Sequence, residues 1–132
     1  SYEERLARVV SAGADFYLMP SRFEPCGIGQ MYAMRYGAPP VVRLTGGLDD
    51  TVIDLDESPA TATGFGFRDF RTEELTKTVR RAMRVFRKSK AEYRRLQRNG
   101  MLTDFSWGAA VQHYLVTYEQ AVTYRRERPA GG

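Results

Sequence analysis

The residues best able to do chemistry lie in one short loop, which carries a single carboxylate, that of Glu24. Before this loop, residues 16–19 form an apolar run that is too short for a helix and is typical of a parallel strand buried on both faces. Ligands of open α/β sheets bind beyond the carboxyl ends of the strands. We therefore expect Glu24 to lie at a ligand site, with Gly27 opening a helix whose backbone N–H groups face the ligand.

One carboxylate beside backbone N–H groups suits a group transfer in which positive charge develops on the transferred group and negative charge on the leaving group. Glu24 can orient hydroxyl groups of a substrate and stabilise the positive charge, while N–H groups after Gly27 can donate to anionic oxygen atoms. A two-carboxylate hydrolase does not fit, because the loop supplies one carboxylate. Asp50 and Asp54 lie four residues apart on a predicted short helix, and we interpret them as its solvent face.

Hydrophobic periodicity and turn residues predict the elements that position this loop. Strands are predicted at residues 15–19, 41–42 and 64–67, and helices at 2–12, 27–35, 48–54, 72–86, 91–99 and from 106 onward. This order is typical of the α/β class. It predicts half of a doubly wound, Rossmann-like parallel sheet of about three strands with flanking helices, followed by C-terminal helices.

The predicted helix ends and core rest on particular residues. We expect Thr72 and Ser106 to act as N-caps, and Gly100 to end a helix. We also expect one apolar face of the last helix to join the hydrophobic core, with Trp107 as its anchor and Leu115 buried. That face consists of Trp107, Val111, Tyr114, Leu115, Tyr118 and Val122.

The length of 132 residues fits one domain. We divide it into a βαβ-type region with the sugar-nucleotide site at 1–70, C-terminal helices at 71–125 and a flexible tail at 126–132. A complete doubly wound domain has about five or six strands, so we expect this chain to be part of a larger domain.

Composition narrows the class of protein: 42% of the residues are hydrophobic and 27% are charged, as in soluble globular proteins. The chain has one cysteine and one histidine, Cys26 and His113, so we expect no disulfide, no metal site and no cofactor. Cys26 has no neighbouring base and contributes its backbone, while His113 is interpreted as a surface residue. No apolar run approaches the length of about 20 residues that spans a bilayer, so we expect no membrane partner and a cytoplasmic location.

The net charge of +4 raises the question of a nucleic-acid partner. Most of the basic residues lie on predicted amphipathic helices between residues 80 and 98, with others at 125–128. Solvent-exposed helix faces account for such charge, so we expect no nucleic acid to bind. Binding of a polyanion through these helices is the alternative.

Four motifs carry a close resemblance to bacterial glycogen synthases and plant starch synthases: SRFEPCG at 21–27 with Gln30, YG at 36–37, TGGL at 45–48 with DTV at 50–52, and DFSW at 104–107. The resemblance runs from Tyr2 to about Tyr124 and covers the C-terminal portion of that family's polypeptide. It implies a retaining glucosyltransferase of the GT-B type, with two Rossmann-like domains. Such an enzyme transfers glucose from ADP-glucose to the non-reducing end of an α-1,4-glucan without a metal, in the cytoplasm or in a plant plastid.

The resemblance also implies roles for single residues, with Glu24 as the catalytic carboxylate. Gly29 departs from the family, which often has a threonine, serine or asparagine there. The family's cationic residues at the pyrophosphate and its lysine-glycine-glycine loop find no match in this chain, so we expect the isolated chain to be inactive. The other matched positions are Cys26, Gly27 and Ile28, whose backbone amides hold donor glucose and phosphate, Tyr2 and Tyr32 at the nucleotide, and Thr45, Gly46 and Gly47 in a cleft glycine loop.

A second hypothesis belongs to another class of protein. The chain is then a non-catalytic relative that binds carbohydrate or self-associates, for example as a homodimer paired through an exposed sheet edge.

Overall fold

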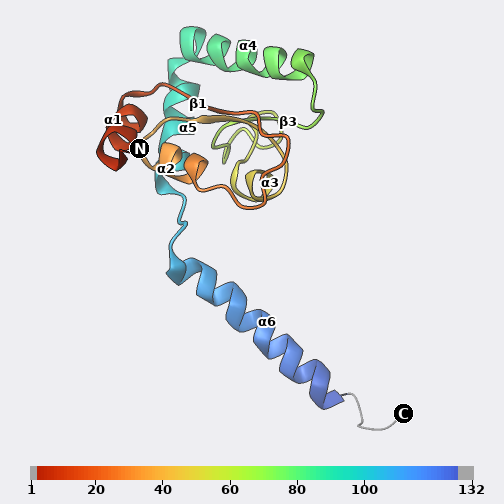
Figure 1. Ribbon diagram of the computed structural model, residues 1–132. Helices are drawn as coiled ribbons and strands as arrows, with labels where there is room; N and C mark the ends of the chain where they lie inside the picture. Colours follow the sequence, from red (N-terminus) through yellow and green to blue (C-terminus); the bar gives the residue numbers. More distant parts are fainter. Residues whose placement is uncertain (1–2, 128–132) are drawn as a thin grey trace.

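The computed structural model describes residues 3–127, apart from the side chains of His113 and Glu127. The elements follow the predicted order, with bounds shifted by a few residues. They are α1 (Glu4–Gly13), β1 (Tyr17–Met19), α2 (Gly29–Arg35), β2 (Pro40–Arg43), α3 (Gly47–Thr51), β3 (Phe65–Phe67), α4 (Thr72–Lys88), α5 (Lys90–Leu102) and α6 (Trp107–Glu127) (Figure 1). Within residues 3–127, no helical segment has both the length and the hydropathy of a transmembrane span.

The three strands form one parallel sheet in the order β1-β2-β3. Tyr17 of β1 aligns with Pro40 of β2, and Val42 of β2 aligns with Gly66 of β3. Parallel neighbours need crossover connections, which here contain α2 and α3. The loops that follow β1 and β2 therefore leave the same edge of the sheet, and the predicted α/β class is confirmed.

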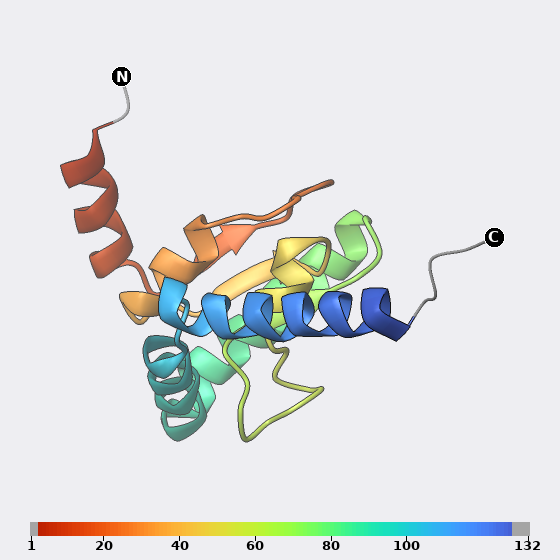
Figure 2. The same ribbon diagram turned by 90° about the horizontal axis from the view of Figure 1, so that it is seen from below.

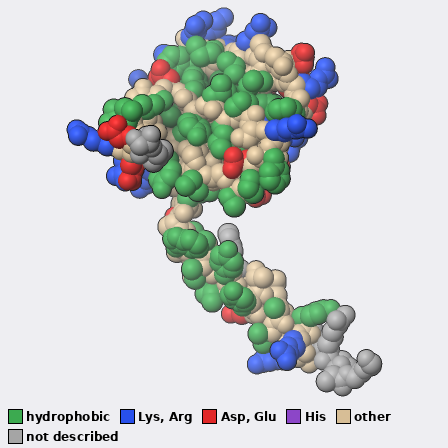
Figure 3. Space-filling model, viewed as in Figure 1, with side chains coloured by type: hydrophobic (Ala, Val, Ile, Leu, Met, Phe, Trp, Pro, Cys, Tyr) green, Lys and Arg blue, Asp and Glu red, His purple; other side chains and the backbone are tan. Residues whose placement is uncertain are grey.

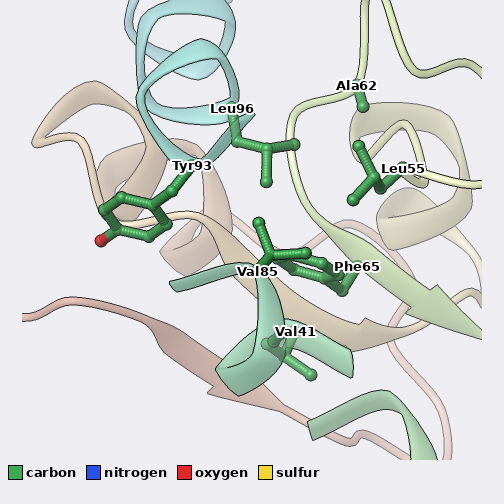
Figure 4. Packing of buried hydrophobic residues seen from close by; sticks show 8 residues of the cluster. Val41, Leu55, Ala62, Phe65, Val85, Tyr93 and Leu96 are labelled. Carbon is green, nitrogen blue, oxygen red and sulfur yellow. The ribbon is translucent and has the colours of Figure 1, made fainter. Parts of the chain in front are cut away.

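Helices cover both faces of the sheet, as in a doubly wound fold. Val41 and Val42 point to opposite faces, because successive side chains of a strand alternate. On the side of α4 and α5, the buried cluster consists of Val41, Leu55, Ala62, Phe65, Ala82, Val85, Tyr93 and Leu96 (Figure 4). On the side of α2 and α3, it consists of Met34, Val42, Leu44, Leu48 and Val52.

An aromatic group ties the start of β1 to the first of these faces. The ring of Phe16 packs edge-on against Phe65, Phe86 and Tyr93, with centroids 5.6–6.1 Å away. The Tyr93 hydroxyl donates a hydrogen bond of 2.7 Å to the carbonyl oxygen of Asp15. Burial, reinforced by the negative charge of Asp15, raises the pKa of Tyr93 to about 12.

Two of the predicted helix ends are wrong and one is confirmed. Thr72 is the first residue of α4 rather than its cap, and Arg71 at the cap position makes no side-chain capping bond. Gly100 lies inside α5, which continues to Leu102, and it is buried where a Cβ atom would come 3.2 Å from the Met34 side chain. This glycine therefore allows α5 to pack closely on α2. Ser106 does cap α6, because its Oγ accepts a bond of 3.4 Å from the Ala109 N–H.

The expectation that α6 packs into the core is wrong. Figure 1 shows α6 leading away from the sheet, and Figure 2 gives the view from below. Trp107 is 80% exposed and Leu115 is 48% exposed. Hydrophobic side chains gather in several groups along α6 in Figure 3, with polar and charged atoms between them. The apolar pattern indicated a face that needs cover, but the described residues do not supply that cover. Residues 128–132 of the predicted tail lie outside the described residues, while Arg126 and Glu127 belong to α6.

Candidate functional site

The loop between β1 and α2 presents the carboxylate singled out in the sequence. Glu24 is partly exposed, and the Ser21 hydroxyl donates a long bond of 3.4 Å to its Oε2 atom. Within residues 3–127, no lysine or arginine pairs with this carboxylate. Most of the hydrogen-bonding capacity of the Glu24 carboxylate is therefore available to a ligand.

The three backbone amides that follow Glu24 are also available. Gly27 has a φ of +65°, which a helix does not allow, so α2 begins at Gly29 rather than at Gly27. The N–H groups of Cys26, Gly27 and Ile28 thus belong to the loop, not to the first turn of a helix as expected. None of them finds an acceptor within residues 3–127. Consecutive unpaired donors of this kind form a concavity suited to anionic oxygen.

A glycine turn after β2 packs directly against this loop. The Gly47 N–H donates to the carbonyl oxygens of Glu24 and Pro25, at 3.2 and 3.3 Å. A Cβ atom on Gly46 would overlap the Glu24 carbonyl oxygen, and one on Gly47 would overlap that of Cys26. Gly46 also has a φ of +51°. Only glycine permits this approach, and the structure thus brings together the two predicted segments, residues 24–28 and 45–47.

Of the two residues predicted to contact the nucleotide, Tyr2 and Tyr32, the structure describes Tyr32. Tyr2 lies outside the described residues. The exposed ring of Tyr32 lines a depression of about 760 Å³ between α2 and the start of α6, together with Ile28 of the loop. Glu24 and the glycine turn are not part of its wall.

The far wall of this depression is the connection from α5 to α6. Arg35 donates a bond of 2.7 Å to the carbonyl oxygen of Met101, which holds α2 to the end of α5. The Ser106 N–H donates to the Asp104 carboxylate at 2.8 Å, and this bond lowers the pKa of Asp104. Both interactions fix the point at which α6 leaves the body.

The interpretation of Asp54 as a solvent-facing residue is wrong. Helix α3 ends at Thr51, so Asp54 lies beyond it and does not share a helix face with Asp50. Asp54 is 4% exposed and forms an ion pair with Arg81, which the sequence had placed on a solvated face. Its carboxylate also accepts bonds from the N–H groups of Asp56 and Gly66. Burial lowers the pKa of Arg81, but the hydrogen bonds and charges of Asp54 and Asp56 together outweigh this effect and raise it overall.

Gln30 is a further residue whose role the sequence did not reveal. It was noted there as part of a motif, but its side chain is fully buried beneath the loop. Its amide nitrogen donates bonds of 3.0 Å to the Gly27 carbonyl oxygen and to the Thr51 hydroxyl. No periodicity signals this position, because a glutamine in a helix is usually exposed.

The parallel sheet, the helices on both faces and the ligand-ready loop at the end of β1 define a Rossmann-like α/β unit with its site at the strand ends. Comparison with protein-family models finds no match. The chain is 50% identical to the glycogen synthase of Moorella thermoacetica over 125 residues, which are 95% of this chain and 26% of that protein. It is 46% identical to the glycogen synthase of Koribacter versatilis over 129 residues, covering 98% of this chain and 26% of that protein.

The fold of the chain is also similar to that of a solved enzyme structure. The chain matches the catalytic domain of starch synthase IV from Arabidopsis thaliana bound to ADP and acarbose, with a TM-score of 0.82 and 37% identity. The match covers 93% of this chain and 26% of that one. The chain belongs to the glycogen synthase and starch synthase family, and it spans about a quarter of the length of the relatives it matches.

Proposed function

We propose that this chain supplies the donor-binding part of a retaining glucosyltransferase, which moves glucose from ADP-glucose to the non-reducing end of an α-1,4-glucan. The observation that carries this proposal is the pairing of an available carboxylate, that of Glu24, with three unpaired amides two to four residues later. The match to a starch synthase domain bound to ADP and acarbose supports a nucleotide and a glucan as ligands.

The two charges that develop during transfer explain why this pairing suits the reaction. As the bond to the diphosphate lengthens, the anomeric carbon becomes positive, and the Glu24 carboxylate stabilises that charge through the sugar. The amides of Cys26, Gly27 and Ile28 donate to donor hydroxyl or phosphate oxygens. These donors are held by the fold before the ligand arrives, so little reorganisation is needed during reaction.

The proposal assigns the remaining predicted residues to the same ligand. Tyr32 contacts the nucleotide from the depression beside Ile28, and Tyr2 stacks on the adenine ring. Thr45, Gly46 and Gly47 line the cleft. Because the chain spans about a quarter of its relatives, we expect it to bind the donor weakly and not to turn over alone.

A chimera tests the proposal. The chain replaces the matching quarter of the Moorella thermoacetica glycogen synthase, and glucose transfer from ADP-glucose to a glucan primer is measured. Transfer within about tenfold of the parent enzyme supports the proposal. A folded chimera that binds ADP-glucose but transfers no glucose contradicts it. The isolated chain, assayed beside it, should transfer none.

A second candidate function follows from apolar surface that the described residues leave exposed. Leu18 on the edge strand β1 is 55% exposed, and Leu6, Val9 and Val10 form an exposed stripe on α1. These surfaces favour a self-associating or carbohydrate-binding module, with a homodimer paired through β1. Light scattering on the isolated chain distinguishes the candidates, since a monomer at micromolar concentration excludes the stable dimer.

A further inference from the structure

The two loops of the site are joined by a partly buried relay of hydrogen bonds. The Gln30 amide nitrogen donates to the Gly27 carbonyl oxygen, at 3.0 Å, and so holds the first loop. The same nitrogen donates to Thr51 Oγ1, also at 3.0 Å, and Thr51 Oγ1 donates onward to the Gly47 carbonyl oxygen at 2.6 Å. Gln30 and Thr51 thus connect the loop after β1 to the glycine turn through their side chains.

The direction of these bonds identifies the Gln30 orientation. Because the Thr51 hydroxyl spends its proton on Gly47, it can only accept from Gln30, so the nitrogen of the Gln30 amide must face it. The opposite orientation would place the Oε1 acceptor against two other acceptors, the Gly27 carbonyl oxygen and Thr51 Oγ1. The Oε1 atom is consequently turned toward the Cα atom of Gly27, where a Cβ would come within 2.8 Å of it.

This orientation leaves a buried acceptor without a partner. Gln30 is 0% exposed, and its Oε1 atom has no hydrogen-bond donor within residues 3–127. A methionine of similar length would fill the same space without that penalty. A buried group that costs stability and lies beneath a ligand loop indicates a function of the loop rather than of the core.

We propose that Gln30 and Thr51 are positioning residues, which keep the Cys26–Ile28 amides and the glycine turn at the spacing that the sugar nucleotide requires. This inference rests on the proposed function, because it concerns the same site. Neither residue contacts the ligand. Each acts through the carbonyl group that it holds, those of Gly27 and Gly47.

Substitutions at Thr51 in the 132-residue chain test the relay. Thr51→Val keeps the shape and removes the hydroxyl, while Thr51→Ser keeps the hydroxyl. Thr78→Val is the matched control, because Thr78 is a buried helical threonine whose hydroxyl bonds only the Glu74 carbonyl four residues earlier, at 2.8 Å. The readouts are calorimetric affinity for ADP-glucose and hydrogen exchange of the Gly47 N–H without ligand.

We expect Thr51→Val to weaken ADP-glucose binding about tenfold and to speed Gly47 exchange, and Thr51→Ser to restore both. Thr78→Val should change neither, although it lowers stability by a similar amount. Equal affinity and unchanged exchange in Thr51→Val would overturn the proposal.

Gln30→Met separates positioning from packing. Positioning predicts an unchanged or higher melting temperature with about tenfold weaker ADP-glucose binding, because the unpaired acceptor and the two donated bonds are lost together. A lower melting temperature with unchanged affinity would show that Gln30 serves packing alone. If the unsubstituted chain binds no ADP-glucose, the proposed function fails for this chain. Exchange at Gly47 then still decides whether the relay holds the two loops.

Discussion

Two carboxylates at the sheet, those of Glu24 and Asp54, have opposite surroundings. Asp54 is 4% exposed, accepts from two backbone N–H groups and pairs with Arg81. Glu24 is partly exposed, and its carboxylate accepts one long bond from Ser21 within the described residues. The Asp54 carboxylate is fully engaged by partners within the fold, whereas the Glu24 carboxylate remains available to a ligand.

The surroundings of a carboxylate distinguish a structural acid from a candidate catalytic one. A buried carboxylate is stable only when charges and donors surround it, and those partners leave no room for a ligand. A carboxylate for chemistry keeps its oxygen atoms free and is held through its backbone, as Gly47 holds the Glu24 carbonyl. Substitution of Asp54 should therefore mainly lower stability, and substitution of Glu24 should mainly lower activity.

The largest effect is expected from Asp54→Asn, measured as the free energy of unfolding in urea. The substitution removes the charge that pairs with Arg81, and breaking such a pair should cost about 3 kcal/mol. Asp56 remains paired with Arg81, which places the value at the lower end of the usual range. Asp50→Asn is the exposed control and should change stability very little. A loss at Asp54 as small as the control's would remove the contrast.

Glu24→Gln should lower activity and leave stability nearly unchanged. In the chimera with the Moorella thermoacetica enzyme, turnover should fall about 100-fold, because a preorganised electrostatic contact in the transition state is lost. The unfolding free energy of the isolated chain should change by less than about 0.5 kcal/mol. Ser21→Ala removes only the long bond to the carboxylate and should preserve most turnover. Near-normal turnover in Glu24→Gln would refute the catalytic role.

Tyr93 is a third titratable group, and its side chain is buried in the hydrophobic core. Its pKa is raised from 10.0 to about 12, so the unfolded chain loses the phenolic proton first as the pH rises. The stabilisation is therefore complete below pH 10 and is lost between pH 10 and about 12. Alkaline unfolding curves should show this loss, and Tyr93→Phe should flatten that part of the curve. An equally steep loss in Tyr93→Phe would assign it to other groups.

The smallest effect is expected from Leu115→Ala on α6. The sequence pattern predicted a buried Leu115, whose truncation would leave a cavity at a cost of about 2–5 kcal/mol, but Leu115 is 48% exposed. In the isolated chain we now expect a loss of less than about 0.5 kcal/mol. Leu96→Ala is the buried counterpart, with Leu96 1% exposed, and should show the full cavity cost. Thermal melts of both variants make the comparison, and equal losses would place α6 in a core.

The elements and the site loop were predictable because their signals are local. The apolar run of β2 between prolines and glycines, and the glycines at 46 and 47, specify strand and turn from neighbouring residues alone. The Asp54 pair was missed because Arg81 lies 27 positions away and resembles its exposed neighbours in the sequence. Gly100 was assigned to a helix end because its close approach to Met34 depends on how α5 packs on α2.

The location of α6 illustrates another limit. Its apolar side chains were recognised correctly, but periodicity cannot tell which surface covers them. The roles of Cys26, Gly27 and Ile28 as donors to a ligand also remain a prediction. Their amides are unpaired within the described residues, and the ligand that they bind has to be measured.

Titration of the 15N-labelled chain with ADP-glucose, followed through the backbone amide resonances, tests the claim that residues 26–28 bind the donor. Saturable shifts are expected at Cys26, Gly27 and Ile28 and at the glycine turn. The amides of Asp56 and Gly66, which are bound to Asp54, should stay unchanged. Saturable binding that leaves residues 26–28 unmoved, or shifts centred on Asp54, would contradict the claim.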